Sequence, residues 1–349
     1  MSRNTKKQQK YLLLADGSSP HILKWAKELV KYFDVYIISL NGVSEDLLEV
    51  IDSSNIYVLN QKSISTGGNH KLILKLPKIK KIIKNISPHY LNAHYLSSYG
   101  FLGALSTGVV PSMKLIQSTW GSDVLVEPFL NSLRKMVAKY ALSKADFITS
   151  DSWYMGDVIT NLVGEKEIIV FPFGFDKIEQ NSTSKEKIIF SNRALKDFYN
   201  IDKIIKWFAR QDSEYRLVIA NDGVERNNLE RLTKKLGIEF HVQFVGYLSS
   251  TKQEEYYKKA TYYVSIPSSD ATSVSLLEAM KYGAIPIVSN IPANREWILD
   301  GVNGMFFNEL KALNKLKINE NFAQINYNML QKRAIFPQSI EDFIKKVIS

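Results

Sequence analysis

Residues 268–289 read SSDATSVSLLEAMKYGAIPIVS, and this stretch decides the fold. It follows an apolar run at 262–266, which predicts a buried strand. Small polar residues then form a loop, and a helix is expected from Val274 to about Tyr282. A second apolar run at 285–289 predicts the next strand. Strand, loop, helix and strand in this order form the repeating unit of a parallel sheet covered by helices.

The same alternation of short apolar runs and amphipathic stretches continues over the whole chain, which predicts an α/β fold with parallel sheets. A helix is also expected at 77–86, because isoleucines recur there at helical spacing behind Pro77. Besides the two strands above, the apolar runs predict strands at 11–15, 35–40, 56–59, 90–94, 114–119, 147–150, 168–171, 188–191, 216–220 and 240–244.

The length of 349 residues is too great for one typical core and fits two domains. We predict a first Rossmann-like domain at 1–172 and a second at 173–335, joined by a linker near 171–177. A short amphipathic helix at 336–349 is expected to return to the first domain. Open parallel sheets bind ligands beyond the carboxyl ends of their strands, so the two sheets should face a central cleft that holds the site.

Composition removes several classes of protein. The chain has no cysteine, so disulfides and thiolate metal sites are excluded and a reducing compartment fits. It lacks the signatures of dinucleotide oxidoreductases, P-loop NTPases, zinc hydrolases and serine hydrolases. The five histidines show no ligand spacing, so we expect no metal site. Because no long apolar run is present, we expect a cytoplasmic protein, with a peripheral place on the inner face of the cytoplasmic membrane left open.

The net charge of +10, mostly from lysine, suggests an anionic partner. No nucleic acid is expected, since no basic stripe with interleaved aromatic residues and no known nucleic-acid module is present. Within the deciding stretch, the amides of Ser273, Val274 and Ser275 stand at a helix start, where unpaired N–H groups and the helix dipole suit a diphosphate. Glu278, about one turn further on, could accept two hydroxyls of a ribose.

This stretch closely resembles the donor-site segment of the family-4 retaining glycosyltransferases of the GT-B fold. That family carries two acidic residues eight positions apart, and here they are Asp270 and Glu278. The resemblance implies that Asp270 grips the donor sugar, that Glu278 holds the ribose, and that no metal is required. Arg193 resembles the family's diphosphate-binding arginine, with Lys196 nearby, although Phe198 or Tyr199 stands at the expected lysine position. Two further residues resemble the segment that flanks the base, namely Gly246 and Tyr247.

The resemblance extends to the first domain. Gly17 and His21 lie in a segment similar to the family's first strand-to-helix loop, where a glycine would let the backbone approach the diphosphate. His94 matches a strand-end histidine, and either a substrate contact or a structural role is open for it. Trp120 stands where many relatives have a histidine; it can stack or donate one N–H but cannot do acid–base work. Asp123 matches the family's aspartate, and capping is as good an explanation as substrate binding.

The resemblance implies a retaining glycosyltransferase that moves a sugar from a nucleoside diphosphate, most often UDP, to a saccharide or polyprenyl-linked saccharide in surface polysaccharide assembly. The nucleotide sugar is a co-substrate, and no cofactor is expected. A sugar-nucleotide 2-epimerase of the same fold and a non-catalytic anion- or nucleic-acid-binding protein are the alternatives. We also predict contact with an anionic membrane surface through lysines that project from the 77–86 helix, opposite its isoleucines: Lys78, Lys80, Lys81 and Lys84.

Overall fold

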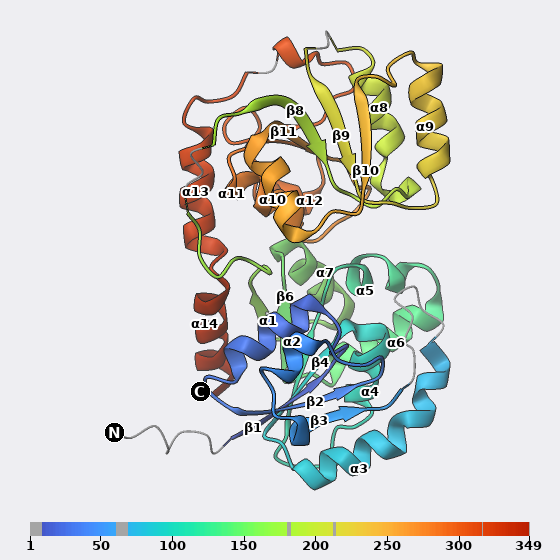
Figure 1. The fold of residues 1–349 in the computed structure, drawn as a ribbon. Coiled ribbons are helices and arrows are strands. Elements are labelled where there is room, and N and C mark those ends of the chain that lie inside the picture. Colours follow the sequence, from blue (N-terminus) through green and yellow to red (C-terminus); the bar gives the residue numbers. More distant parts are fainter. Residues whose placement is uncertain (1–8, 61–68, 180–182, 212–213, 316, 349) are drawn as a thin grey trace. The chain divides into compact units, whose positions relative to one another are not determined.

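The computed structural model describes residues 9–60, 69–179, 183–211, 214–315 and 317–348 (Figure 1). The chain divides into two compact units, the first formed by Met1–Phe173 together with Phe336–Ser349 and the second by Gly174–Ile335. Each unit contains a parallel sheet with helices on both faces. The predicted pair of Rossmann-like α/β domains is confirmed.

The first unit is built on a seven-stranded parallel sheet with the order β3-β2-β1-β4-β5-β6-β7. Its strands are short, and nearly all residues of β1, β4, β5 and β6 are buried on both faces, as expected for a doubly covered sheet. The strands are β1 (Lys10–Leu14), β2 (Asp34–Ser39), β3 (Ile56–Val58), β4 (Tyr90–His94), β5 (Lys114–Ser118), β6 (Phe147–Ser150) and β7 (Ile168–Val170).

The strand order assigns the helices of this unit to faces. The chain moves one way along the sheet from β1 to β3 and the opposite way from β3 to β7, so right-handed crossovers place the two sets of connecting helices on opposite faces. The first set contains α1 (Pro20–Leu29) and α2 (Glu45–Leu48). The second contains α3 (Leu76–Ile86), α4 (Phe101–Ala104), α5 (Ser122–Leu125), α6 (Ser132–Ser143) and α7 (Trp153–Val163).

The last helix, α14 (Phe336–Ile348), packs in the core of the first unit beside α1. The ring of Trp25 on α1 lies 6.0 Å from that of Phe336 and 5.3 Å from that of Phe343, measured between ring centroids. Ile340, Ile344 and Val347 join the same buried cluster. The apolar face of this helix therefore explains why the chain returns to the first unit at its end.

The second unit has a six-stranded parallel sheet with the order β10-β9-β8-β11-β12-β13. Neighbouring residues of a strand point to opposite faces, so Ile189 packs with Ile204 and Leu229, whereas Phe190 packs with Tyr257. The strands are β8 (Glu186–Ser191), β9 (Arg216–Ala220), β10 (Val242–Gly246), β11 (Ala260–Ser265), β12 (Ile285–Val288) and β13 (Met305–Phe306). The helices are α8 (Ile201–Phe208), α9 (Arg226–Lys235), α10 (Ser250–Lys259), α11 (Val274–Lys281), α12 (Pro292–Arg295) and α13 (Phe322–Arg333).

One predicted strand is displaced. The apolar run at 240–244 predicted a strand there, but β10 begins at Val242 and ends at Gly246. Phe240 is 93% exposed and lies in the turn that follows Gly237, whose φ of 68° is left-handed. Hydrophobic residues in a turn therefore mimicked the start of a strand. β13 was not predicted, because it has only two residues.

Candidate active site

The candidate site of the second unit lies where β8 and β11 end. These two strands are parallel neighbours, so the loops that follow them emerge at the same edge of the sheet. Arg193 stands two residues after β8, and Asp270 lies in the loop between β11 and α11. Two residues 77 positions apart in the sequence are thus brought together by strand pairing alone.

Arg193 is the centre of this site. Its Nη2 donates to Oδ2 of Asp270 at 3.0 Å, and its Nη1 donates to Oγ of Ser273 at 2.7 Å. The guanidinium also lies over the ring of Tyr199, 4.5 Å from the ring centroid. Burial by itself would lower the pKa of Arg193, but Asp270, Tyr263 and Tyr199 outweigh it and raise that pKa, so the side chain keeps its charge.

Asp270 is largely enclosed, with 20% of its side chain exposed against 13% for Arg193. Burial raises the pKa of the Asp270 carboxyl, while Arg193 and the amide of Ala271, which donates to Oδ1 at 3.1 Å, limit that rise. The sequence resemblance assigned Asp270 to the donor sugar alone. The structure adds a contact with the arginine assigned to the diphosphate, so the two roles are physically linked.

Ser273 connects this ion pair to α11. It is the N-cap of the helix, and its hydroxyl oxygen accepts from the N–H of Leu276 at 3.4 Å. Val274 and Ser275 form the first turn, whose N–H groups have no acceptor within the helix. The Ser273 hydroxyl therefore contacts both Arg193 and the start of α11. This contact places a positive charge and helix N–H groups side by side.

Glu278 lies one turn along α11 in a network that the sequence did not predict. The hydroxyl of Tyr257 hydrogen-bonds to Glu278 and accepts from Nδ2 of Asn192 at 2.8 Å. Asn192 also accepts from the hydroxyl of Tyr263 at 3.1 Å and donates to Gln253 at 2.7 Å. Burial raises the pKa of Tyr257 well above its usual value, so this hydroxyl stays protonated beside the carboxylate. The only sequence signal for the network was the position of Asn192 next to Arg193.

The remaining predicted residues of this unit lie further out. Lys196 is exposed on the loop after Arg193, and the expected second cation is replaced by the ring of Tyr199 beneath the guanidinium. Gly246 has a left-handed φ of 69°, and its carbonyl accepts from the N–H of Asn221 at 2.6 Å. Tyr247 is 78% exposed, so its ring is available for stacking.

In the first unit, the partly buried Trp120 forms a pair with the buried His94. Nε1 of Trp120 donates to Nδ1 of His94 at 3.2 Å, which leaves the His94 proton on Nε2. His94 is 1% exposed, and burial, with a smaller contribution from His21, lowers its pKa to about 3. His21 lies edge-on to Trp120 with ring centroids 5.2 Å apart, and burial lowers its pKa too. These histidines are neutral members of an aromatic cluster that also contains Phe173.

Asp123 holds two loops of the first unit together. Its Oδ1 accepts from the amides of Trp120 and Gly121, both at 3.0 Å, and its Oδ2 accepts from the amide of Leu96 at 2.9 Å. Burial raises its pKa to about 6, and the N–H donors limit the rise. Both carboxylate oxygens are therefore engaged with backbone groups, and the structural role that the sequence left open is the one this geometry supports.

Gly17 is explained by packing. A Cβ at this position would lie 2.6 Å from Cγ1 of Val43 and 2.8 Å from the carbonyl oxygen of Gly42. The amide of Gly17 donates to Oγ of Ser39 at 3.0 Å. The close approach for which the sequence suggested a diphosphate is thus made, in this structure, by the neighbouring loop.

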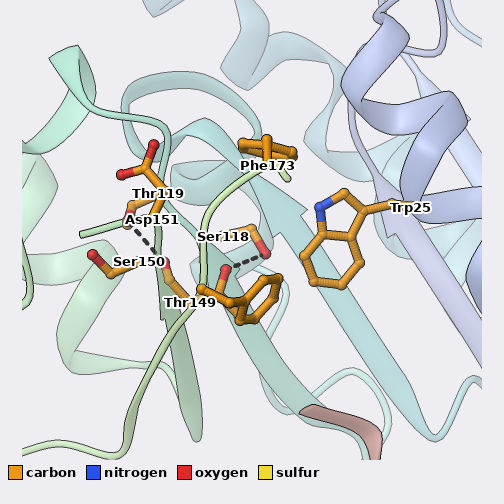
Figure 2. A pocket seen from close by; sticks show the side chains of 8 residues that line it. Trp25, Ser118, Thr119, Thr149, Ser150, Asp151 and Phe173 are labelled. Atoms are coloured by element: carbon orange, nitrogen blue, oxygen red, sulfur yellow. Dashed lines mark hydrogen bonds between the residues drawn. The ribbon is translucent and has the colours of Figure 1, made fainter. Parts of the chain in front are cut away.

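A chain of hydrogen-bonded polar side chains crosses the sheet of the first unit. Asn92 donates to the hydroxyl of Tyr11 and accepts from Ser118, which in turn accepts from Thr149, at 2.8–2.9 Å. Figure 2 shows the Ser118–Thr149 bond beside a small cavity of about 10 Å³, bordered by Trp25. That volume is at the lower limit for a single water molecule, so this space is not a substrate pocket.

Among the residues that the structure describes, no three His, Asp or Glu side chains gather closely enough to hold a metal ion. In the same part of the chain, no helix is both long and apolar enough to cross a bilayer.

Comparison with known proteins identifies the family. The model of the glycosyl transferase 4-like domain matches residues 10–152, and the model of glycosyl transferases group 1 matches residues 174–322. The chain belongs to the family-4 glycosyltransferases of the GT-B fold. The first family model matches residues of the first unit, and the second matches residues of the second unit. The second unit of this glycosyltransferase therefore carries the group 1 segment, which includes Arg193 and Glu278.

Three relatives illustrate the similarity. The alpha-monoglucosyldiacylglycerol synthase of Streptococcus pneumoniae is 23% identical over 53% of this chain and 46% of its own length. The lipopolysaccharide core biosynthesis glycosyltransferase LpsE of Rhizobium meliloti is 25% identical over 42% of each chain. The chain thus spans about half the length of these curated relatives. The crystal structure of Anabaena HepE with UDP and glucose has the same fold, with a TM-score of 0.67, 15% identity and coverage of 97% of this chain and 95% of that one.

Proposed function

We propose that this glycosyltransferase transfers a sugar, with retention of configuration, from a nucleoside diphosphate to a saccharide or lipid-linked saccharide. One observation carries the proposal: Arg193 converges with Asp270 and with Ser273, the N-cap of α11. This arrangement offers a guanidinium and helix N–H groups to an anion, next to a carboxylate that can accept sugar hydroxyls.

The donor is proposed to be a UDP-sugar. HepE, which shares the fold, was crystallised with UDP and glucose. In this chain, Glu278 would accept ribose hydroxyls, and Tyr247, which is exposed after β10, would stack on the base. Tyr257 and Asn192 would hold Glu278 in place before the nucleotide arrives.

The reaction needs stabilisation of a leaving diphosphate. As the bond between the anomeric carbon and the phosphate oxygen breaks, negative charge grows on the diphosphate, and Arg193 and the first turn of α11 would stabilise it. The acceptor hydroxyl forms the new bond on the same face of the sugar, and its proton passes to the leaving phosphate. Because Arg193 already bonds to Asp270, the diphosphate would share this arginine with the residue that grips the sugar.

Calorimetry with UDP in excess EDTA tests the donor site. We expect binding without a divalent metal, because a cation and a helix start take the place that a metal would occupy. Loss of binding in EDTA, restored by magnesium or manganese, would contradict metal independence. Once a donor is identified, NMR of the anomeric proton of the product decides whether configuration is retained.

The acceptor is proposed to be bound by the first unit and to belong to surface polysaccharide or glycolipid assembly. Two relatives carry names from glycolipid and lipopolysaccharide synthesis. A lipid-linked acceptor would place the enzyme at a membrane surface. The lysines of α3 fit this role, since Lys78, Lys81 and Lys84 are exposed and Lys80 is half-buried, while the isoleucines of that helix are buried.

A further inference from the structure

A run of large apolar side chains lies exposed on the first unit, at the short 3₁₀ turn Glu127–Phe129 and on α6. The exposed fractions are 60% for Phe129, 59% for Leu130, 65% for Leu133 and 60% for Met136. We call these four residues the α6 apolar face. Elsewhere in the described residues, exposed large apolar side chains stand singly, as Val224 and Phe240 do in the second unit, or as the pair Ile73 and Leu74. Contiguous exposed apolar residues mark an interaction surface more often than scattered ones do.

The α6 apolar face is separate from the face that anchors the helix. The buried residues of α6 are Ala138, Ala141 and Leu142. Leu133 and Met136 are three positions apart and share another side of the helix. A helix that only covers a sheet needs one apolar face and presents polar residues on the other, so the second apolar face of α6 is not required by the fold.

A groove continues this surface toward α7. It is open, has a volume of about 540 Å³, and is lined by Met136, Lys139 and Tyr140 of α6 with Leu162 of α7. Its apolar walls suit the acyl chain of a lipid, and Lys139 at its side suits an anionic headgroup. The apolar face and the groove share Met136, so they form one continuous surface.

The charges around this surface select its partner. Arg134, Lys135 and Lys139 lie on α6, Lys144 follows it, and the helix contains no acidic residue. An anionic surface complements them. A second copy of the chain would not, because a two-fold contact through this face would bring the same cations together. Right-handed crossovers also place α3, with its exposed lysines, on the same face of the sheet as α6.

We propose that the α6 apolar face inserts into the headgroup region of an anionic lipid bilayer, with the neighbouring cations on the lipid phosphates. Interfacial helices combine these features, an apolar face flanked by lysine and arginine. This inference rests on the proposed function, because a lipid-linked acceptor is the reason for the enzyme to bind a membrane. Binding to vesicles requires neither donor nor acceptor, so its failure would leave the proposed transferase reaction untouched.

Vesicle flotation tests the proposal. The full chain is mixed with vesicles of phosphatidylcholine alone or with equal parts of phosphatidylcholine and phosphatidylglycerol. We expect the wild type to bind the mixed vesicles. The partition coefficient of the double variant Leu133→Ser/Met136→Ser should be lower by about tenfold or more, since binding scales with buried apolar area. The matched control Val224→Ser/Phe240→Ser removes exposed apolar side chains of the second unit and should bind as the wild type does.

A variant that is expected to bind vesicles more tightly distinguishes a loss of binding from misfolding. Leu133→Trp should bind the mixed vesicles more tightly, because tryptophan favours the membrane interface. Melting temperatures equal to that of the wild type would show that the substitutions leave the fold intact. Unchanged binding of the double serine variant, or a wild type that does not bind, would overturn the proposal. A dimer that the double serine variant abolishes would overturn it too, and would assign the α6 apolar face to self-association.

Discussion

In the second unit, Arg193, Asp270 and Ser273 bond to one another at a partly exposed strand edge. In the first unit, both carboxylate oxygens of Asp123 accept from backbone amides, and the partly buried Trp120 donates to the buried His94. Both sets were selected by the same kind of motif. The comparison teaches that a motif residue at a strand end can either face a ligand or shape the loop that does, and that the partners of its polar atoms distinguish the two cases.

The largest expected effect is that of Arg193→Ala on nucleotide binding. Loss of two charge-assisted hydrogen bonds, each worth about 1.5–3 kcal/mol, should weaken UDP binding about a hundredfold or more. Calorimetry measures this. Arg216→Ala is a matched control, because Arg216 stands at the start of β9, at the opposite edge of the same sheet, and pairs there with Glu186 at 3.7 Å. If both variants bind UDP equally well, the donor site is elsewhere, and the contrast between the two units fails.

Asp123→Asn tests the structural role in the first unit through pH. The folded pKa of Asp123 is about 6, against an ordinary value of 3.8. Between these values the unfolded chain loses its proton while the folded chain keeps it, so the contribution of Asp123 to stability falls as pH rises. The fall should reach about 3 kcal/mol above pH 6. Below the ordinary pKa, both states are protonated and the contribution is at its maximum.

Urea unfolding of the wild type and of Asp123→Asn at several pH values measures this contribution. Asparagine does not titrate in either state, so the stability difference between the two proteins should shift in favour of the variant as pH rises. A difference that stays constant with pH would mean that the pKa of Asp123 is the same in the folded and unfolded states, because its three amide donors offset the effect of burial.

Sequence and structure agree best where local chemistry decides. The start of α11 at Val274 was predicted from the small polar loop before it, and the structure brings Arg193 to that start through the pairing of neighbouring parallel strands. Tyr199 was read only as a missing lysine, because a ring beneath a guanidinium is a tertiary contact without a sequence period. Gly17 suggested a ligand, but the space it leaves is filled by Val43, and sequence spacing does not reveal which loop will lie there.

Asp270→Ala sharpens the comparison within the donor site. Asp270 is expected to contact the donor sugar, so its loss should reduce turnover with the full donor by about 10²-fold. UDP affinity should not fall, because removal of the carboxylate releases Arg193 for the diphosphate. Steady-state kinetics and calorimetry of one preparation give both quantities. A parallel loss of UDP affinity and turnover would mean that Asp270 acts only by positioning Arg193.

Glu278→Gln should have a smaller effect, on the nucleotide rather than on the sugar. The amide can still accept from Tyr257 but has lost the charge that favours ribose hydroxyls, so UDP affinity should fall about tenfold. Glu255→Gln is a suitable control, since Glu255 lies on α10 and pairs only with Lys252 among the ion pairs of the described residues. Equal affinity of the two variants for UDP would remove Glu278 from the site.

Trp120→Phe should have the smallest effect. It tests whether the Trp120–His94 pair is structural, as its hydrogen bond indicates, and does not contact substrate. The substitution keeps an aromatic ring in the cluster and removes the N–H that donates to Nδ1 of His94. Loss of one neutral hydrogen bond should cost about 1 kcal/mol of stability. The pKa of His94 should stay low, because burial is its main cause. The proton, however, would no longer be restricted to Nε2. Long-range nitrogen–proton NMR of the imidazole distinguishes the two tautomers. A wild-type His94 that titrates near the ordinary value of 6.5 would place this residue in contact with solvent or substrate, and the first unit would then resemble the second.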